Sequence, residues 1–241
     1  METMSIIYEP KGKAKEYSDL SANLYSGCAH GCTYCYAPAA LRKKREDFNC
    51  NVSMRKNVLN LLEKDLIKND YSGMNVLMSF TTDPYQPCEE KLKLTRRAIR
   101  IFNSYGCNFT ILTKGGTRAR RDFELYKKGD VFATTLTFDN EQDSTAWEPL
   151  AATPLNRIEA IIDAKKAGIE TWVSMEPVIN ATQTLNLIDL THEHVDLYKI
   201  GKANYISGID IDWHVFVNDA IKKLTLLNKK YYIKADLAKF I

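Results

Sequence analysis

The chain has 241 residues, of which 45% are hydrophobic and 26% are charged, and its formal net charge is +3 at pH 7. This composition is typical of a globular protein with enough apolar side chains for a full core, and the small positive charge permits an anionic partner without requiring one. No apolar run approaches the roughly 20 residues of a membrane span. The N-terminal stretch METMSIIYEPKGKAKEY lacks the apolar core of a signal peptide, so we expect a cytoplasmic protein with no membrane partner.

Short β-prone segments alternate with helical patterns along the chain. A first strand is predicted just before a cysteine-rich segment, at about residues 22–25. Further strands are predicted at residues 75–80, 108–113, 131–138, 171–175 and 196–200. Each of these segments is short and mostly apolar, as expected for strands buried in a parallel sheet.

Amphipathic helical patterns fill the segments between these strands. Ser53 is expected to cap a helix over residues 54–69, in which Val58, Leu62 and Leu66 recur four residues apart. Further helices are predicted over LTRRAIRIFNS, RDFELYKK and LNRIEAIIDAKKAG. This alternation favours βα units and a parallel sheet. Because the count reaches about six units against eight in a complete TIM barrel, we predict an α/β fold, a partial (βα)6 TIM-like barrel with a C-terminal helix and strand extension.

The predicted organisation is one core with two flanking parts. Residues 1–20 form an N-terminal extension, residues 21–205 the partial barrel, and residues 206–241 a helix and strand that close the barrel. In such barrels the chemistry gathers where the strands end and the loops begin. Polar and ionisable residues cluster at those places, in GCAHGCTYCYAP, SFTTDPYQP, ILTKGG, TTLTFDNE, SMEPVIN and KIGKANY.

The first of these segments holds three cysteines, Cys28, Cys32 and Cys35. Clustered cysteines bind zinc or iron–sulfur centres, and disulfides are rare in the cytosol. A structural zinc site needs a fourth ligand, and no second cysteine pair follows, although His30 lies inside the loop. A gap of three residues followed by a gap of two wraps one compact loop around a [4Fe-4S] cubane and leaves one iron open to a substrate or cofactor. Both the iron–sulfur site and a zinc site with His30 remain possible at this point.

The Cys-x3-Cys-x2-Cys segment after the first strand of a partial βα barrel resembles the radical S-adenosylmethionine (SAM) superfamily. This resemblance implies a [4Fe-4S] cluster on the three cysteines, whose open iron holds the amino and carboxylate groups of S-adenosyl-L-methionine. An electron from the cluster would cleave the sulfonium, and the resulting 5′-deoxyadenosyl radical would abstract hydrogen from a substrate. A reductant such as flavodoxin or ferredoxin is then needed. Tyr34 matches an aromatic position near the adenine, or it packs beside the cluster.

The resemblance narrows to the spore photoproduct lyase-like ("DNA repair photolyase") group. It rests on NLYSGCAHGCTYCYAP, FTTDPYQPCEEKLKLTRRAI, ILTKGG, TTLTFDNE and a late PVI, in order between Asn23 and Asn180. The resemblance implies that Lys114 and Thr134, with Thr135 as the register alternative, contact the SAM carboxylate. It also implies that Thr81 helps to hold the amino end of SAM. The alternative for Lys114 is a solvated charge at a strand end.

One position departs from that group. Spore photoproduct lyase uses a cysteine just before its Thr-Ser-Asp stretch as hydrogen donor, and this chain has Phe80 there. The aromatic residue that assists the transfer does match, as Tyr36. Cys88, eight residues beyond Phe80, either substitutes for the missing donor or is an ordinary buried cysteine. The resemblance therefore does not imply that this chain catalyses the reaction of spore photoproduct lyase.

Charged residues near the strand ends suggest the class of substrate. Glu176 is expected at the barrel mouth, where it orients substrate or binds the ribose hydroxyls of SAM. Lys199 and Lys202 meet an anionic group or form rim salt bridges. The basic stretches at 42–45, 96–97 and 117–121 contact phosphates or are solvated helix faces.

Two functions follow from these patterns. The first is a radical SAM enzyme that abstracts hydrogen from a nucleobase, a nucleotide or nucleic acid, with a peptide as the other substrate class left open. The alternative is a non-catalytic nucleic-acid-binding protein stabilised by zinc or an iron–sulfur cluster.

Overall fold

One sheet of eight strands organises the chain, in the spatial order β1-β2-β5-β6-β7-β8-β9-β10. The computed structural model describes residues 5–204 and 206–241. Strand β1 pairs antiparallel with β2, and every later neighbour in the sheet is parallel. Since β1 and β10 form the two edges, the predicted partial barrel is confirmed. The strands are β1 (Ile7–Tyr8), β2 (Leu20–Ala22), β5 (Asn75–Met78), β6 (Asn108–Thr113), β7 (Val131–Thr135), β8 (Glu170–Val178), β9 (Leu197–Lys202) and β10 (Lys230–Ile233).

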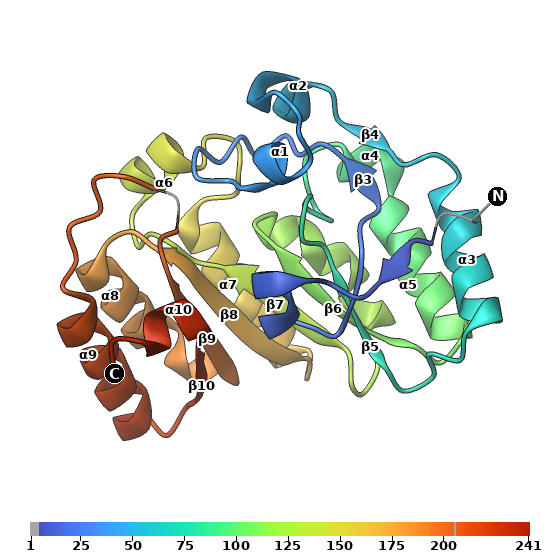
Figure 1. The fold of residues 1–241 in the computed structure, drawn as a ribbon. Coiled ribbons are helices and arrows are strands. Elements are labelled where there is room, and N and C mark those ends of the chain that lie inside the picture. The colour runs from blue at the N-terminus through green and yellow to red at the C-terminus, as the bar shows by residue number, and fades with distance from the viewer. Residues whose placement is uncertain (1–4, 205) are drawn as a thin grey trace.

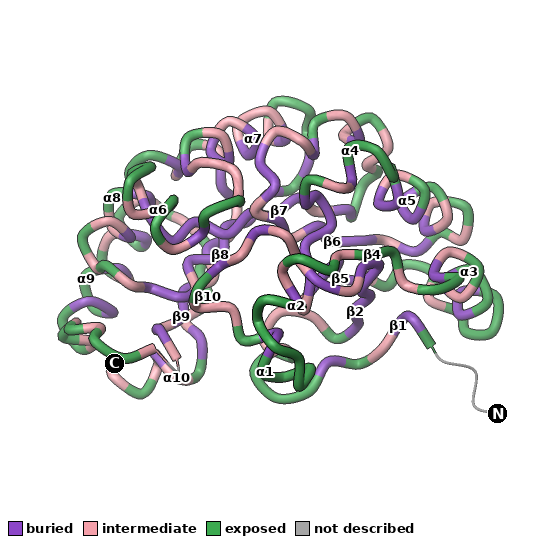
Figure 2. The backbone as a smooth tube through the Cα atoms, turned by 90° about the horizontal axis from the view of Figure 1, so that it is seen from above, coloured by how far each residue is buried: buried purple, intermediate pink, exposed green. Residues whose placement is uncertain are grey.

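The longer helices lie along the convex side of the curved sheet, as Figure 2 shows from above. They are α3 (Val58–Lys68), α5 (Leu94–Ser104), α7 (Pro154–Lys166), α8 (Ala181–Thr191) and α9 (Trp213–Leu226). Of the helices that the structure describes, none has the length and apolar character needed to cross a bilayer. The shorter elements are η1 (Gly12–Glu16), β3 (Tyr25–Ser26), α1 (Ala37–Ala40), α2 (Arg45–Cys50), β4 (Ser53–Met54), α4 (Glu89–Leu92), η2 (Gly116–Leu125), α6 (Glu141–Trp147), η3 (His192–His194) and α10 (Ala235–Ala238).

Helix α7 illustrates how the sequence sets the limits of an element. Thr153 caps its N-terminus by accepting a hydrogen bond from the backbone N–H of Asn156, and Pro154 occupies the first turn, where no donor is lost. The chain turns out of the helix at Gly168, whose positive φ of 77° suits a residue without a side chain. The apolar face of α7 buries Ile161 against the sheet, which stabilises the fold by about 1.5–3 kcal/mol for a side chain of this size.

The cysteine-rich segment lies between two short antiparallel strands that the sequence did not reveal. Strand β3 pairs with β4, with Tyr25 opposite Met54. The prediction that Ser53 caps a helix is therefore wrong, because Ser53 and Met54 form strand β4. Helix α3 begins only at Val58, after Asn57 in the left-handed conformation. The segment RDFELYKK, predicted as an α-helix, overlaps the 3-10 helix η2.

The N-terminal segment bridges the two edges of the open sheet (Figure 1). Ile7 and Tyr8 pair with β2 at one edge. A few residues later, the Glu16 carboxylate accepts hydrogen bonds from the Tyr232 hydroxyl at 3.1 Å and the Ala235 N–H at 2.8 Å, at the other edge. The predicted extension 1–20 thus spans the concave side; its residues 1–4 lie outside the described part of the chain. The domain boundaries stay a prediction.

Candidate functional site

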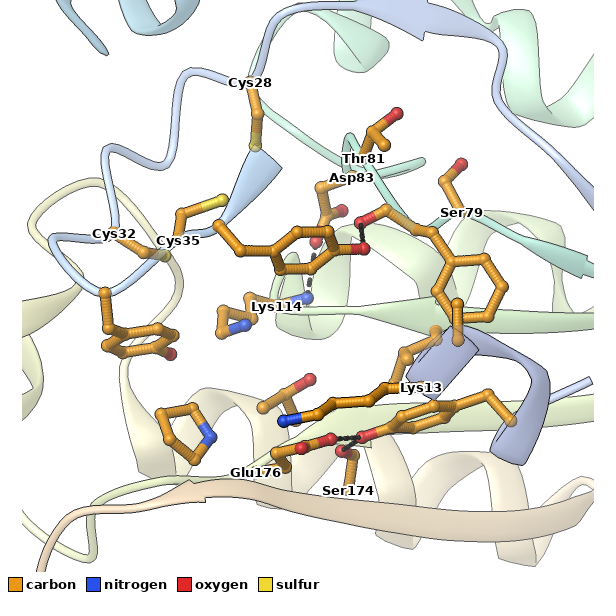
Figure 3. Close-up of a pocket in the computed structure, with 18 of the residues that line it drawn as sticks. Lys13, Cys28, Cys32, Cys35, Ser79, Thr81, Asp83, Lys114, Ser174 and Glu176 are labelled. Atoms are coloured by element: carbon orange, nitrogen blue, oxygen red, sulfur yellow. Dashed lines mark hydrogen bonds between the residues drawn. The ribbon is translucent and has the colours of Figure 1, made fainter. Parts of the chain in front are cut away.

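A cavity of about 420 Å³ opens at the carboxyl ends of the parallel strands. Figure 3 shows Cys28, Cys32 and Cys35 on one side of it and Ser174 and Glu176 on the opposite side, with Lys114 between them. Its described lining also contains Lys11, Lys13, Tyr17, His30, Tyr34, Tyr36, Phe80, Thr81, Asp83, Thr135, Lys202 and Lys234. The structure therefore brings residues from the N-terminal segment, the cysteine loop and successive strand ends to one place.

Backbone contacts hold the cysteine loop in position. The guanidinium of Arg45 in α2 donates to the carbonyls of Cys32 and Cys35, both at 2.8 Å. The Ala29 N–H donates to the side-chain oxygen of Gln86 at 2.9 Å. Gly27 has a φ of 84°, and a Cβ there would lie 2.6 Å from the carbonyl oxygen of Phe48, so only glycine fits. The three thiols are consequently presented to the cavity by a loop whose own backbone is braced.

The chemistry of these thiols suits a bound metal cluster. All three are free cysteines. Burial is the main cause that raises the pKa of the Cys28 thiol and raises that of Cys32 to about 12. A cysteine ligand must be a thiolate, and bound iron supplies the positive charge that stabilises the thiolate in such a place. Within residues 5–204 and 206–241, no three His, Cys, Asp or Glu side chains gather as a single-ion site.

His30 is engaged away from the thiols. Its Nδ1 lies 3.4 Å from the Asp83 carboxylate and its Nε2 lies 3.3 Å from the Arg118 guanidinium. Burial lowers the pKa of His30 to about 4, so the ring is neutral at pH 7. Because both ring nitrogens have partners, Asp83 in the loop after β5 and Arg118 in η2, the arrangement gives no support to His30 as a fourth ligand.

Asp83 ties the loops after β5 and β6 together. Its carboxylate accepts hydrogen bonds from the Lys114 N–H at 2.7 Å, the Thr113 hydroxyl at 2.5 Å and the Tyr85 N–H at 2.8 Å. These bonds place Lys114 at the end of β6 with its side chain in the cavity. The Asp83 carboxylate acts here as a brace within the protein.

The ammonium of Lys114 lies 5.5 Å from the centre of the Tyr34 ring. Burial opposes its charge, but Cys32 and Glu148 hold the pKa of Lys114 above its usual value, so it is a cation. The Tyr34 hydroxyl donates to Glu148, which is paired with Arg157 at 2.5 Å. This buried network fixes the ring of Tyr34 beside Lys114.

The two threonine candidates on β7 lie on opposite faces of the sheet. The hydroxyl of Thr134 is fully buried and donates to the carbonyl of Thr113 at 2.8 Å. Thr135 lines the cavity. Side chains alternate along a strand, so the register alternative Thr135, and not Thr134, faces the site. Thr81 also lines the cavity, and its N–H donates to Asn23 at 3.0 Å.

Tyr36 faces the cavity, whereas Cys88 does not line it. The hydroxyl of Tyr36 donates to the carbonyl of Phe80 at 3.2 Å, so these two positions lie next to each other. Cys88 stands at the start of α4, half-buried against the hydrophobic core. Burial and the neighbouring Glu89 raise the pKa of its thiol. This position favours the ordinary buried cysteine over a hydrogen donor.

The wall opposite the cysteines contains residues that sequence reasoning missed. The Glu176 carboxylate accepts from the Tyr17 hydroxyl at 2.5 Å and from the Lys234 ammonium at 2.6 Å. Tyr17 also shares a hydrogen bond of 2.8 Å with Ser174. The alternation of β8 was a signal for Ser174, two residues before Glu176. Tyr17, Lys234 and Lys13 carry no such signal, because they reach the cavity from the two ends of the chain.

Comparison with known proteins identifies the family of this arrangement. Residues 22–194 match the sequence profile of the radical SAM superfamily. An uncharacterized protein of Methanocaldococcus jannaschii is 29% identical over 160 residues, which cover 65% of this chain and 59% of that protein. A "radical SAM Nalpha-GlyT isomerase" of Pseudomonas phage M6 is 25% identical over 186 residues, which cover 76% of this chain and 37% of that one.

The fold resembles that of a solved spore photoproduct lyase variant with bound AdoMet and dinucleoside spore photoproduct. The TM-score is 0.71, with 12% sequence identity over 93% of this chain and 78% of that one. At this identity the likeness establishes the shared fold alone. The chain spans 59% or less of the length of these two sequence relatives.

Proposed function

This chain belongs to the radical SAM superfamily, and we propose that it is an enzyme that abstracts hydrogen from a substrate after reductive cleavage of SAM. The superfamily uses a [4Fe-4S] cluster and SAM; when bound, they supply the electron and the 5′-deoxyadenosyl group for that abstraction. The observation that carries the proposal is one cavity with three free thiols on a braced loop and a cationic lysine facing them.

The residues of the cavity divide between the two cofactors. Cys28, Cys32 and Cys35 would hold the cluster, and the Lys114 ammonium would pair with the SAM carboxylate. Tyr34 would lie beside the adenine, kept in place by its bond to Glu148.

Three further residues complete the proposed SAM site. Thr81, after β5, and Thr135, at the end of β7, would offer hydroxyls to the amino and carboxylate groups of SAM. Among the described residues, both hydrogen bonds to the Glu176 carboxylate end on Oε2. Its Oε1 would therefore accept from a ribose hydroxyl.

We infer a nucleobase-containing substrate, in keeping with the dinucleoside held by the structural neighbour. The reductant would be a flavodoxin or ferredoxin. Because Phe80 stands where the lyase has its hydrogen-donating cysteine, the return of hydrogen would differ from lesion repair. Transfer of deuterium from a labelled oligonucleotide into 5′-deoxyadenosine would support this substrate class, and label-free product formed with the oligonucleotide present would argue against it.

An anaerobic assay with matched cysteine variants tests the reaction. The protein is reconstituted with iron and sulfide, SAM and dithionite are added, and 5′-deoxyadenosine is measured by mass spectrometry. We expect Cys28→Ala, Cys32→Ala and Cys35→Ala each to lose the cluster absorption near about 400 nm and reduce product to background. Cys50→Ala, at an exposed position at the end of α2, is the control and should keep both. A fully active single variant among the first three would refute the proposal.

A further inference from the structure

The cavity has a second cationic wall, remote from Lys114 along the sheet. Lys202 is the last residue of β9, and it lines the cavity. Its ammonium lies 5.0 Å from the ring centre of Trp213 and 4.9 Å from that of Phe240. In the part of the chain that the structure describes, its recorded partners are thus two aromatic rings, which orient a cation without neutralising it.

Lys13 approaches the same place from the other end of the chain. It lines the cavity from η1 and forms an ion pair with Asp236. Asp236 lies in α10, and Phe240 follows two residues after that helix ends at Ala238. Lys13 and Lys202 therefore contact the same short C-terminal segment.

The described residues that line the cavity carry more positive than negative charges. It contains five lysines but only two carboxylates, Asp83 and Glu176. Asp83 is satisfied by hydrogen bonds from its own neighbours, and Glu176 is paired with Lys234. Lys114 faces the cysteine loop, and Asp236 offsets Lys13 from outside the lining. Among the described residues, the ammonium groups of Lys11 and Lys202 have no recorded carboxylate partner, so their charge is left for a group that enters the cavity.

We propose that Lys202, assisted by Lys13, forms a subsite for a phosphate group of the substrate. This inference rests on the proposed function, because it identifies what the reacting molecule carries. An ammonium group donates charge-assisted hydrogen bonds to phosphate oxygens, and two lysines from different elements match an anion with several acceptors. The end of a parallel strand is the place where such folds bind their ligands. The phosphate can be inorganic or part of a nucleotide.

Calorimetric titration distinguishes inorganic phosphate from a nucleotide as the ligand of the subsite. The full chain, reconstituted anaerobically and saturated with SAM, is titrated with thymidine 5′-monophosphate, thymidine and inorganic phosphate. We expect the monophosphate to bind at least about tenfold more tightly than thymidine, with an affinity that falls as salt is added. Binding of inorganic phosphate alone would support a subsite that recognises the anion itself. Equal affinity for the monophosphate and thymidine, or no binding of either anion, would overturn the proposal.

Matched lysine variants locate the subsite. Lys202→Met keeps the side-chain stem over Trp213 and Phe240 but removes the charge, and we expect about tenfold weaker binding of the monophosphate. Lys202→Arg should retain most of the affinity. Lys222→Met removes an exposed charge from α9 outside the cavity and should change nothing. Equal effects of the Lys202→Met and Lys222→Met changes would overturn the proposal, and thermal melting confirms that each variant is folded.

The outcome is separable from that of the proposed function. Phosphate binding is measured as heat with no reductant present, whereas the reaction is measured as 5′-deoxyadenosine. A protein that cleaves SAM but binds neither anion would keep the function and lose the subsite. A protein that binds phosphate through Lys202 but never cleaves SAM would keep the subsite and lose the function.

Discussion

Two hydrogen bonds fix the backbone of Lys114, whereas its charged side chain extends into the cavity. Its N–H donates to Asp83, and its carbonyl accepts from the Ala152 N–H at 3.0 Å. Its ammonium lies over Tyr34 in the cavity. The fixed backbone thus sets where the ammonium group lies, and the ammonium offers its positive charge to a bound ligand. The position of the ammonium beside Tyr34 in the cavity favours a ligand-binding lysine over a solvated strand-end charge.

Replacing Lys114 tests its role in binding SAM. We expect Lys114→Met to weaken SAM binding about 10- to 100-fold, the range for a charge-assisted hydrogen bond in a buried site. Calorimetric titration with SAM on anaerobically reconstituted protein measures the affinity. The iron content should stay at about four per chain, since Lys114 is not a cluster ligand. An unchanged SAM affinity would reject the assignment.

At the scale of elements, strand periodicity decides which side chains meet the ligand. Ser174 and Glu176 are two residues apart on β8, and both line the cavity. Thr134 and Thr135 are one residue apart on β7, so only one of them does. The cysteine loop depends on other elements. Strands β3 and β4 pair on either side of it, and Arg45 of α2 donates to a carbonyl of the loop. Sheet strands therefore supply Ser174, Glu176 and Thr135 to the cavity, and the segment between β3 and β4 supplies the three cysteines.

The adjacent threonines form a matched pair for mutagenesis. We expect Thr135→Val to weaken SAM binding about threefold to tenfold with little change in melting temperature. Thr134→Val should leave SAM affinity unchanged but lower the free energy of unfolding by about 1 kcal/mol, because its bond to the Thr113 carbonyl is lost. Titration with SAM and urea unfolding measure the two effects. The reverse pattern would show that the register places Thr134 in the site.

At the scale of the whole molecule, the two ends of the chain complete the cavity together. The N-terminal segment crosses the concave side and is fixed by Lys199, whose ammonium donates to the carbonyls of Glu16 at 3.3 Å and Tyr17 at 3.0 Å. Tyr17 then reaches Glu176. Residues near both ends of the sequence thereby join Glu176 in the wall opposite the cysteines.

This junction predicts a pH-dependent stability. Burial, followed by the charge of Lys234, lowers the pKa of Lys199 to about 8. Between pH 8 and about 10.4, the unfolded chain binds more protons at this residue than the folded chain, so the contribution of Lys199 to stability rises with pH. We expect the difference in unfolding free energy between the native chain and Lys199→Met to grow in favour of the native chain from pH 8 to 10. Urea unfolding at both pH values measures it, with Lys222→Met as control; a difference that does not change with pH contradicts the expectation.

The sequence by itself determined the α/β class, most strands and the three cysteines, because these follow from local periodicity and spacing. Strand β6 was predicted with its observed bounds, Asn108–Thr113. The predicted end of β7 is wrong, because the β-prone run VFATTLTF continues to Phe138 while pairing with β8 stops at Thr135. Local patterns report which residues prefer to be buried, but not where a neighbouring strand ends.

Only the tertiary structure decided how the site is enclosed. The choice between Thr134 and Thr135 required the register of β7, and the exclusion of Cys88 from the lining required the position of α4. Tyr17 and Lys234 meet at Glu176 although they lie near opposite ends of the sequence. Contacts of this kind depend on the closure of the whole chain around the sheet, which spacing along the sequence does not encode.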